Sequence, residues 1–486
     1  MKKGKNGTNI EKMSYKELWS GFDTATHYGT NYDTVRKEFL YGGRVPAVYY
    51  CLNGFSDGDL NEKLIAYMLK NENATEYIEK DREKFFRLAV PFGDVSEKEK
   101  EEEALYALYS GNSVLLIEGI DRYIVIDTRH YPGRGIEEPP KDKVLRGSRD
   151  GFAEALAPNS ALIRRRIRDN RLIFEKLTLG ECTKTDLLVC YMDGLADKSY
   201  VEDLKQRISS VRTPGLNLGL ETLSELLIPK GWYNPFPKVR YTERPDAAAA
   251  MLLEGSVILL CDNYPAAMIL PTAIFDFLQD TDDFYFSPLI GGYMKLVRNG
   301  VYLISLLLTP IWYTLQQIPS VLPEGLHFLI YEGESFLPLL LQLLLVEIAV
   351  DGLKLASLNT PDTLSNSLGV ISALIIGDMA VSVGWLSEQV ILYMAFVAIA
   401  NFTQPSYELG YAFKLTRILT LILISFLSYW GLLLGVLFTL LLIVTNRSIS
   451  GSRSYLFPLI PFNRKALFRL FFRGKAKPGN KFTKGS

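Results

Sequence analysis

The sequence ILTLILISFLSYWGLLLGVLFTLLLIV, residues 418–444, decides the class of fold to which this chain belongs. The stretch contains no charged side chain, and it exceeds the roughly 20 apolar residues that cross the hydrocarbon core of a bilayer. A soluble core helix does not need an uncharged stretch of this length. We therefore predict a membrane protein.

Four other apolar segments precede this stretch, centred on Val301–Leu315, Phe336–Val350, Ser367–Trp385 and Val390–Phe402. Little sequence separates one segment from the next. The segments predict an all-α, polytopic transmembrane domain over residues 291–446, followed by a basic tail at residues 447–486.

The positions of Lys and Arg predict the orientation, because cytoplasmic flanks of membrane helices keep positive charge. Lys295 and Arg298 stand directly before the first segment, whereas residues 316–335 contain acids and no Lys or Arg. The tail contains ten Lys and Arg residues and no Asp or Glu. Both termini are therefore expected in the cytoplasm.

Two cytoplasmic termini require an even number of crossings, so one of the five segments must be unusual. Residues 418–444 could form a tight hairpin near Trp430-Gly431. Alternatively, Phe336–Val350, about 15 residues long, could be re-entrant. The sequence leaves both interpretations, and hence four or six crossings, open.

The first 290 or so residues differ from the rest, although whole-chain averages of 48% hydrophobic residues and net charge −1 conceal the difference. They alternate strand-like and helix-like runs, which predicts a cytoplasmic α/β domain. Two small subdomains, residues 29–145 and 146–290, are expected behind a mobile tail at residues 1–28. The tail is basic but lacks the apolar core of a signal peptide.

A weak internal repeat supports two subdomains. Residues 111–127 and 255–270 each follow a helical pattern and contain two short strand-like runs. A hairpin with a turn at Gly42-Gly43 is a candidate third relative of these units. Short strand pairs need helices as cover, so each unit is expected to belong to a larger sheet.

No catalytic set emerges from the sequence. The three His residues are scattered, and Cys51, Cys182, Cys190 and Cys261 lack metal-ligand spacing. We interpret the cysteines as core thiols in a reducing compartment. The chain is therefore predicted to be no enzyme, with no metal and no cofactor.

A basic cluster lies in the second predicted subdomain. Its members Arg164, Arg165, Arg166 and Arg168 are candidates for contact with phosphate or anionic lipid. A solvated helix face paired with nearby acids is the favoured interpretation. Nucleic-acid binding is disfavoured because no aromatic residues interleave with the charge.

Ionisable and polar groups inside the apolar half are candidates for an ion path, because charge at membrane depth is costly unless it faces water or a partner. Glu347 and Asp351 lie four residues apart, Gln342 lies near the same helical face, and Asp378 interrupts the third segment. The alternative is a helix-to-helix salt bridge, for example between Asp351 and Lys354.

Several motifs occur in an order that resembles the A-subunit family of bacterial spore germinant receptors, the GerA family. They are RGSRDGF (146–152), LIRRRI (162–167), KTD (184–186), TERPD (242–246), LEG (253–255), Leu270-Pro271 and DDFY (282–285). YPGRG (131–135), WYNPFP (232–237), PSYEL (405–409) and FPLIPFN (457–463) resemble one branch of that family. The resemblance covers residues 35 to 472.

This resemblance implies an integral protein of the spore inner membrane that acts in germination and assembles into a ring-like, oligomeric ion channel. It also implies membrane lipids and other spore membrane proteins of the germination machinery as partners. A non-conducting scaffold that couples germinant receptors to dipicolinate release is the second hypothesis. A secondary transporter is disfavoured because the apolar half shows no inverted repeat.

Overall fold

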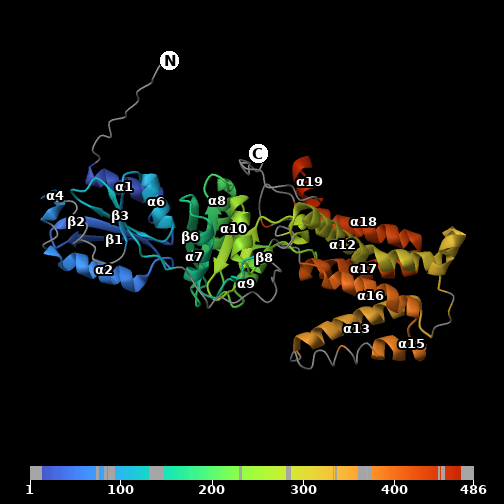
Figure 1. The fold of residues 1–486 in the computed structure, drawn as a ribbon. Coiled ribbons are helices and arrows are strands. Elements are labelled where there is room, and N and C mark those ends of the chain that lie inside the picture. The colour runs from blue at the N-terminus through green and yellow to red at the C-terminus, as the bar shows by residue number, and fades with distance from the viewer. Residues whose placement is uncertain are drawn as a thin grey trace, which may run out of the picture.

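A computed structural model gives the fold shown in Figure 1. The residues that the structure describes are 14–72, 76–80, 85, 94–130, 147–228, 233–280, 286–331, 333, 336–359, 369, 374–446, 449 and 455–471. Two α/β subdomains are followed along the chain by a bundle of helices (Figure 1). The structure thus confirms the predicted fold class, with an α/β N-terminal half and a helical C-terminal half.

The first subdomain is built on a five-stranded antiparallel sheet of order β1-β2-β4-β5-β3. Helices α1 and α6 cover one face of this sheet, and α2 and α4 cover the other. Neighbouring strand residues point to opposite faces, so Val48 and Tyr50 pack under α1 and α6 while Ala47 and Tyr49 pack under α2. The elements in chain order are α1 (Tyr15–Thr26), β1 (Thr34–Tyr41), β2 (Val45–Leu52), α2 (Gly58–Lys70), α4 (Tyr77–Lys80), β3 (Val95–Lys98), α6 (Glu101–Tyr109), β4 (Ser113–Ile117) and β5 (Tyr123–Ile126).

The second subdomain repeats this architecture. Its sheet has the order β6-β7-β9-β10-β8, which is the same arrangement shifted by five strands. Helices α7 and α10 cover one face, and α8 and α9 cover the other. The elements are α7 (Leu156–Arg166), β6 (Leu172–Leu179), β7 (Thr185–Met192), α8 (Lys198–Ser210), α9 (Leu220–Leu227), β8 (Arg240–Thr242), α10 (Pro245–Leu253), β9 (Val257–Cys261) and β10 (Ala267–Leu270).

The internal repeat is therefore a duplication of a whole subdomain. The hairpin β1–β2 corresponds to β6–β7, so it is the first half of each copy and not a third relative of the β4–β5 unit. In both copies the chain enters the next helix at an Asp that caps it. Asp57 accepts from the Leu60 amide, and Asp197 accepts from the amides of Ser199 and Tyr200.

Two glycines fix the same corner in both copies. Gly111 follows α6 and Gly255 follows α10, with φ of 97° and 80°. A Cβ atom would lie 2.8 Å from the Phe55 carbonyl oxygen at Gly111 and 2.5 Å from the Leu195 carbonyl oxygen at Gly255. Glycine is required there because the backbone is left-handed and the neighbouring turn approaches closely.

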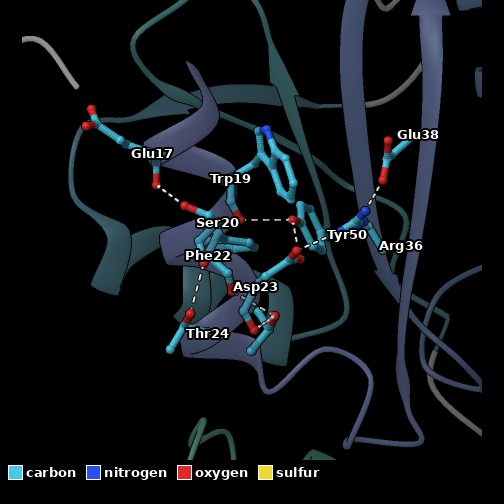
Figure 2. A network of polar contacts seen from close by, with 10 residues as sticks. Glu17, Trp19, Ser20, Phe22, Asp23, Thr24, Arg36, Glu38 and Tyr50 are labelled. Carbon is cyan, nitrogen blue, oxygen red and sulfur yellow. Dashed lines mark hydrogen bonds and ion pairs between the residues drawn. The ribbon is translucent and has the colours of Figure 1, made fainter. Parts of the chain in front are cut away.

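Helix α1 occupies residues that were predicted to form a mobile tail. Its buried Phe22 lies in the core of the first subdomain. Asp23 accepts a 2.7 Å hydrogen bond from the Tyr50 hydroxyl and pairs with Arg36, whose guanidinium lies 4.9 Å from the Trp19 ring centre (Figure 2). The expectation of a mobile tail is therefore wrong from Tyr15 onward, because these residues form a helix whose apolar face packs on the first subdomain.

The helical half consists of α12 and α13, a short third segment, and α16, α17 and α18. Its elements are η1 (Ile274–Leu278), α12 (Pro288–Gln317), η2 (Pro319–Val321), η3 (Glu324–Leu329), α13 (Leu339–Asn359), η4 (Leu374–Met379), α15 (Ala380–Ser382), α16 (Glu388–Phe402), α17 (Tyr407–Leu427), α18 (Tyr429–Thr445) and α19 (Arg464–Phe471). Among the described residues, α12 and α17 are long and apolar enough to cross a membrane.

The apolar stretch 418–444 forms a hairpin, as one of the two interpretations predicted. Helix α17 ends at Leu427, Ser428 has φ of 50°, and α18 begins at Tyr429. The two helices pack side by side (Figure 1). Helix α13, proposed as the alternative irregular segment, is a regular helix of 21 residues.

Glycine allows α17 and α18 to approach closely. A Cβ atom on Gly435 would collide with the Thr420 side chain, and one on Gly431 would collide with the Leu423 backbone. Gly431 and Gly435 are four residues apart on one face of α18, the spacing typical of close helix pairs in membranes. The hairpin therefore depends on small residues at its inner face.

The third predicted segment, Ser367–Trp385, lies partly outside the described residues. Its described end forms a turn of π-helix, η4, and the short α15. The carbonyl of Gly384, which follows α15, accepts a hydrogen bond of 3.2 Å from the Phe336 amide. The regions that precede α13 and α16 therefore lie at the same end of the bundle.

The second subdomain and the helical bundle share a bonded junction. Asn234 donates to the Leu442 carbonyl at 2.8 Å, and Asn446 donates to the Phe236 carbonyl at 3.2 Å. Phe236 also packs in an apolar cluster with residues of α12, α17 and α18, Tyr302 and Phe413 among them. The helix ends are thus fixed to the α/β half.

Candidate functional site in the helical bundle

A buried cluster of charged side chains joins three helices of the bundle. Arg417 on α17 is fully buried and donates through Nε to Glu347 Oε1 on α13 at 2.9 Å. Its terminal nitrogens also bond to Glu347 Oε1 and to the backbone carbonyl of Ser305 on α12. Arg417 therefore connects α12, α13 and α17.

Lys414, one turn before Arg417, completes the cluster. Its Nζ lies 3.0 Å from Glu347 Oε2 and 2.6 Å from Asp351 Oδ2, and it donates to the Glu347 carbonyl at 3.1 Å. Residues three and four apart share a helix face, so the two acids of α13 meet the two bases of α17. Both carboxylate oxygens of Glu347 are thus bonded.

The cluster is electrically balanced, with two acids and two bases. Side-chain exposure is 2% for Glu347, 0% for Arg417 and 36% for Asp351. Buried charges need partners because the apolar interior does not solvate them. Removing one member of a buried pair typically costs about 3–5 kcal/mol, since the other charge is left uncompensated. Asp351 is the member of the cluster whose side chain is partly exposed.

The other predicted ion-path residues are placed differently. Gln342 is buried, donates to the Leu337 carbonyl at 2.8 Å and accepts from the Ser387 amide at 2.9 Å. It therefore links the beginnings of α13 and α16. Asp378 lies apart from the cluster, exposed in the π-helical turn.

Glu347 and Asp351 form helix-to-helix salt bridges, the alternative to an ion path, with Lys414 and Arg417 of α17. The partner suggested as an example for Asp351, Lys354, lies elsewhere. Its Nζ lies 4.4 Å from the ring centre of Tyr407 and 4.6 Å from that of Tyr411, with Phe402 at 5.9 Å. An ammonium over several ring faces is held by cation–π attraction. These contacts attach the second half of α13 to the α16–α17 connection.

The arginine residues of the basic cluster in the α/β half have different roles. Arg164 is fully buried and donates to Asp33 Oδ2 at 2.8 Å and to the Leu172 carbonyl at 2.9 Å. Arg166 pairs with Asp150 at 2.9 Å. The side chains of Arg165 and Arg168 are exposed. Arg164 is therefore a structural residue within the α/β half.

The described residues contain no group of three or more His, Cys, Asp or Glu side chains that could hold a metal ion. Burial raises the pKa of the Cys51 thiol to about 11 and that of the Cys261 thiol to about 12, and it raises that of Cys190 well above its usual range. Cys182 is exposed, contrary to the interpretation of all four cysteines as core thiols.

Sequence reasoning missed the two basic partners, Lys414 and Arg417. They stand directly before the uncharged stretch and look like a cytoplasmic flank. One available signal was their three-residue spacing, which places them on one face of a helix and matches the four-residue spacing of Glu347 and Asp351.

Taken together, these observations define a two-part protein, with a duplicated α/β half followed by a helical half that contains two helices long and apolar enough to cross a membrane and a buried charge cluster. The chain belongs to the GerA family of Bacillus and Clostridium spore germination proteins, whose sequence profile matches residues 23–482.

Three relatives show the extent of the similarity. Stage V sporulation protein AF of Bacillus subtilis is 38% identical over 465 residues, 95% of this chain and 92% of the relative. An uncharacterized membrane protein of B. subtilis, YfkQ, is 30% identical over 76% of this chain and 71% of its own length. Spore germination protein KA of B. subtilis is 27% identical over 93% of this chain and 83% of its own length.

Among solved structures, the N-terminal domain of the A subunit of the Bacillus megaterium spore germinant receptor GerK3 is similar at 23% identity, with a TM-score of 0.39. The match covers 54% of this chain and 97% of that domain.

Proposed function

We propose that this chain acts in spore germination as a multi-pass protein of the spore inner membrane and a subunit of an oligomeric cation-conducting channel. The germination role is supported by relatives named as spore germination and sporulation proteins. The membrane role is supported by the length and composition of α12 and α17. The proposal involves no enzymatic reaction, cofactor or nucleic acid.

The hairpin supports a topology with both termini in the cytoplasm. Counting α17 and α18 separately turns five apolar segments into six, the even number that the distribution of Lys and Arg requires. The α/β half and the basic tail then lie on the core side of the spore membrane. The short turns of η2 and η3, after α12, lie on the other side.

The observation that supports the ion path is the difference in side-chain exposure between the two acids of the cluster. Glu347 is buried with both oxygens bonded, so it holds α13 against α17. Asp351 shares Lys414 and is 36% exposed at its side chain. Rings of carboxylates around an oligomer axis select cations, so Asp351 is assigned to the path, with exposed Asp378 as a second candidate.

The soluble half serves as the platform for assembly in this proposal. No catalytic set is seen among its described residues, and its second subdomain is fixed to the ends of the helices through Asn234 and Asn446. The partners are further copies of this chain, other membrane proteins of the germination machinery, and lipids. Gln342, hydrogen bonded between α13 and α16, positions the helices.

One observation favours the second function, a non-conducting scaffold that couples germinant receptors to dipicolinate release. The cluster of Glu347, Asp351, Lys414 and Arg417 is balanced in charge and completes its bonds within one chain. A cluster of this kind can lock helices together without lining water.

Purified full-length protein in potassium-loaded liposomes distinguishes the two functions. The channel proposal expects oligomers in detergent and potassium release that depends on the protein. Oligomers without release would support the scaffold and contradict the channel. Mass spectrometry of complexes isolated from spore membranes would identify the partner proteins.

A further inference from the structure

A surface of exposed apolar residues lies where α19 packs beside α12, close to the α/β half (Figure 1). We call it the interfacial surface. Its apolar members, with exposed fractions of 86%, 65%, 55%, 69% and 61%, are Leu289, Tyr293, Ile460, Phe462 and Phe468.

The length of α12 places the first part of this surface at a membrane boundary. Thirty residues at 1.5 Å each extend about 45 Å, whereas the hydrocarbon core is about 30 Å thick. Arg298 pairs with Asp280 at 3.3 Å, and Lys295 is buried. These charges mark the polar end of the crossing, so Leu289 and Tyr293 lie at the level of the lipid headgroups.

Helix α19 supplies the second part of the surface. Its sequence, RKALFRLF, contains three basic residues among eight. Arg464 and Phe468, one turn apart, are exposed, and Leu467 and Leu470 are partly buried. The tail from residue 447 to residue 486 contains ten basic residues and no acid. Helices that combine basic and large apolar residues bind in the plane of anionic membrane surfaces.

We propose that the interfacial surface binds anionic phospholipid headgroups in the leaflet next to the soluble half, with the aromatic rings inserted among them. The proposal rests on the proposed function only in requiring that the chain sits in a bilayer. Charge complementarity selects lipid over a second copy of the chain, because a second copy would bring the same basic helix α19 to the contact.

Photo-crosslinking tests this contact in the full-length protein. Benzoylphenylalanine replaces Phe462 or Phe468, and the protein is reconstituted in bilayers of phosphatidylcholine containing one fifth phosphatidylglycerol. We expect lipid adducts at both positions, with phosphatidylglycerol enriched severalfold over its share of the bilayer. The same label in place of exposed Tyr106 on α6 should yield no lipid adduct.

A charge-matched pair of variants separates charge recognition from simple insertion. Neutralising Arg464, Lys465 and Arg469 to Gln should remove the enrichment, since each basic residue near an anionic surface contributes roughly fivefold. Neutralising exposed Lys37, Lys63 and Lys70 to Gln removes the same charge from the first subdomain and should preserve it.

Two outcomes would overturn the proposal. Adducts in proportion to bilayer composition would show that the surface does not recognise anionic headgroups, and cross-links to a second copy would show that it is a protein interface. If the charge variant fails to fold, titration of phosphatidylglycerol with the otherwise unaltered protein distinguishes the same outcomes. If the proposed function fails because the chain does not sit in a bilayer, the result is different. Alkaline carbonate would then extract the unaltered protein from the vesicles.

Discussion

Arg164 Nε lies 2.8 Å from Asp33 Oδ2, and this buried ion pair joins the two copies of the duplicated α/β half. The guanidinium also lies 4.6 Å from the Tyr109 ring centre in the first copy and 4.9 Å from that of Phe174 in the second. The Tyr32 amide donates to the Phe174 carbonyl at 2.8 Å beside it. The two subdomains are therefore expected to move as one body.

Replacing Arg164 with Met should destabilise the α/β half by about 3–5 kcal/mol, because it leaves the buried Asp33 carboxylate without its charged partner. Hydrogen exchange of the full-length protein should accelerate at amides of α7 and β1. Arg168→Met, at an exposed position of the same cluster, should change stability by less than about 0.5 kcal/mol. Equal exchange in both variants would show that the ion pair does not join the subdomains.

Gly435→Ala should weaken the α17–α18 hairpin by about 1–3 kcal/mol, because the added methyl group collides with Thr420. Gly352→Ala on α13 is the matched control, since no atom lies within 4 Å of its Cβ position. Size-exclusion chromatography after heating in detergent measures the folded fraction. A Gly435 variant as heat-resistant as the control would contradict the close packing.

Thiol labelling should separate the cysteines by burial. N-ethylmaleimide at pH 8 should modify exposed Cys182 first, and mass spectrometry identifies the site. Thiolates are the reactive form, and burial raises the pKa of Cys261 to about 12, so this thiol stays protonated until the pH is far higher. Labelling of Cys261 as fast as Cys182 in the folded protein would contradict the core assignment.

Local patterns in the sequence predicted the elements well. The Gly42-Gly43 turn between two strand-like runs predicted β1–β2, and the helical pattern before residue 255 predicted a helix where α10 lies. These features depend on residues close in sequence. Ser428, which starts the turn of the α17–α18 hairpin, lies two residues before the predicted turn at Trp430-Gly431.

Long-range partners could not be predicted from such patterns. Arg164 and Asp33 are 131 residues apart, and Arg417 and Glu347 are 70 apart. Helical periodicity places a charge on a face but does not identify what the face meets. For that reason Arg164 was interpreted as a solvated or anion-binding residue, and Glu347 was interpreted without its partners on α17.

The two acids of α13 provide the most direct test of the ion path. In the proposed channel, Asp351→Asn should preserve oligomer size and reduce potassium flux from liposomes severalfold, because it removes a partly exposed carboxylate. Glu347→Gln should instead lower the amount of assembled protein, because it leaves buried Arg417 uncompensated. Potassium flux per assembled oligomer in the Asp351→Asn variant is the decisive measurement. A severalfold decrease with normal assembly is the predicted result, and undiminished flux with normal assembly would contradict the assignment of Asp351 to the path.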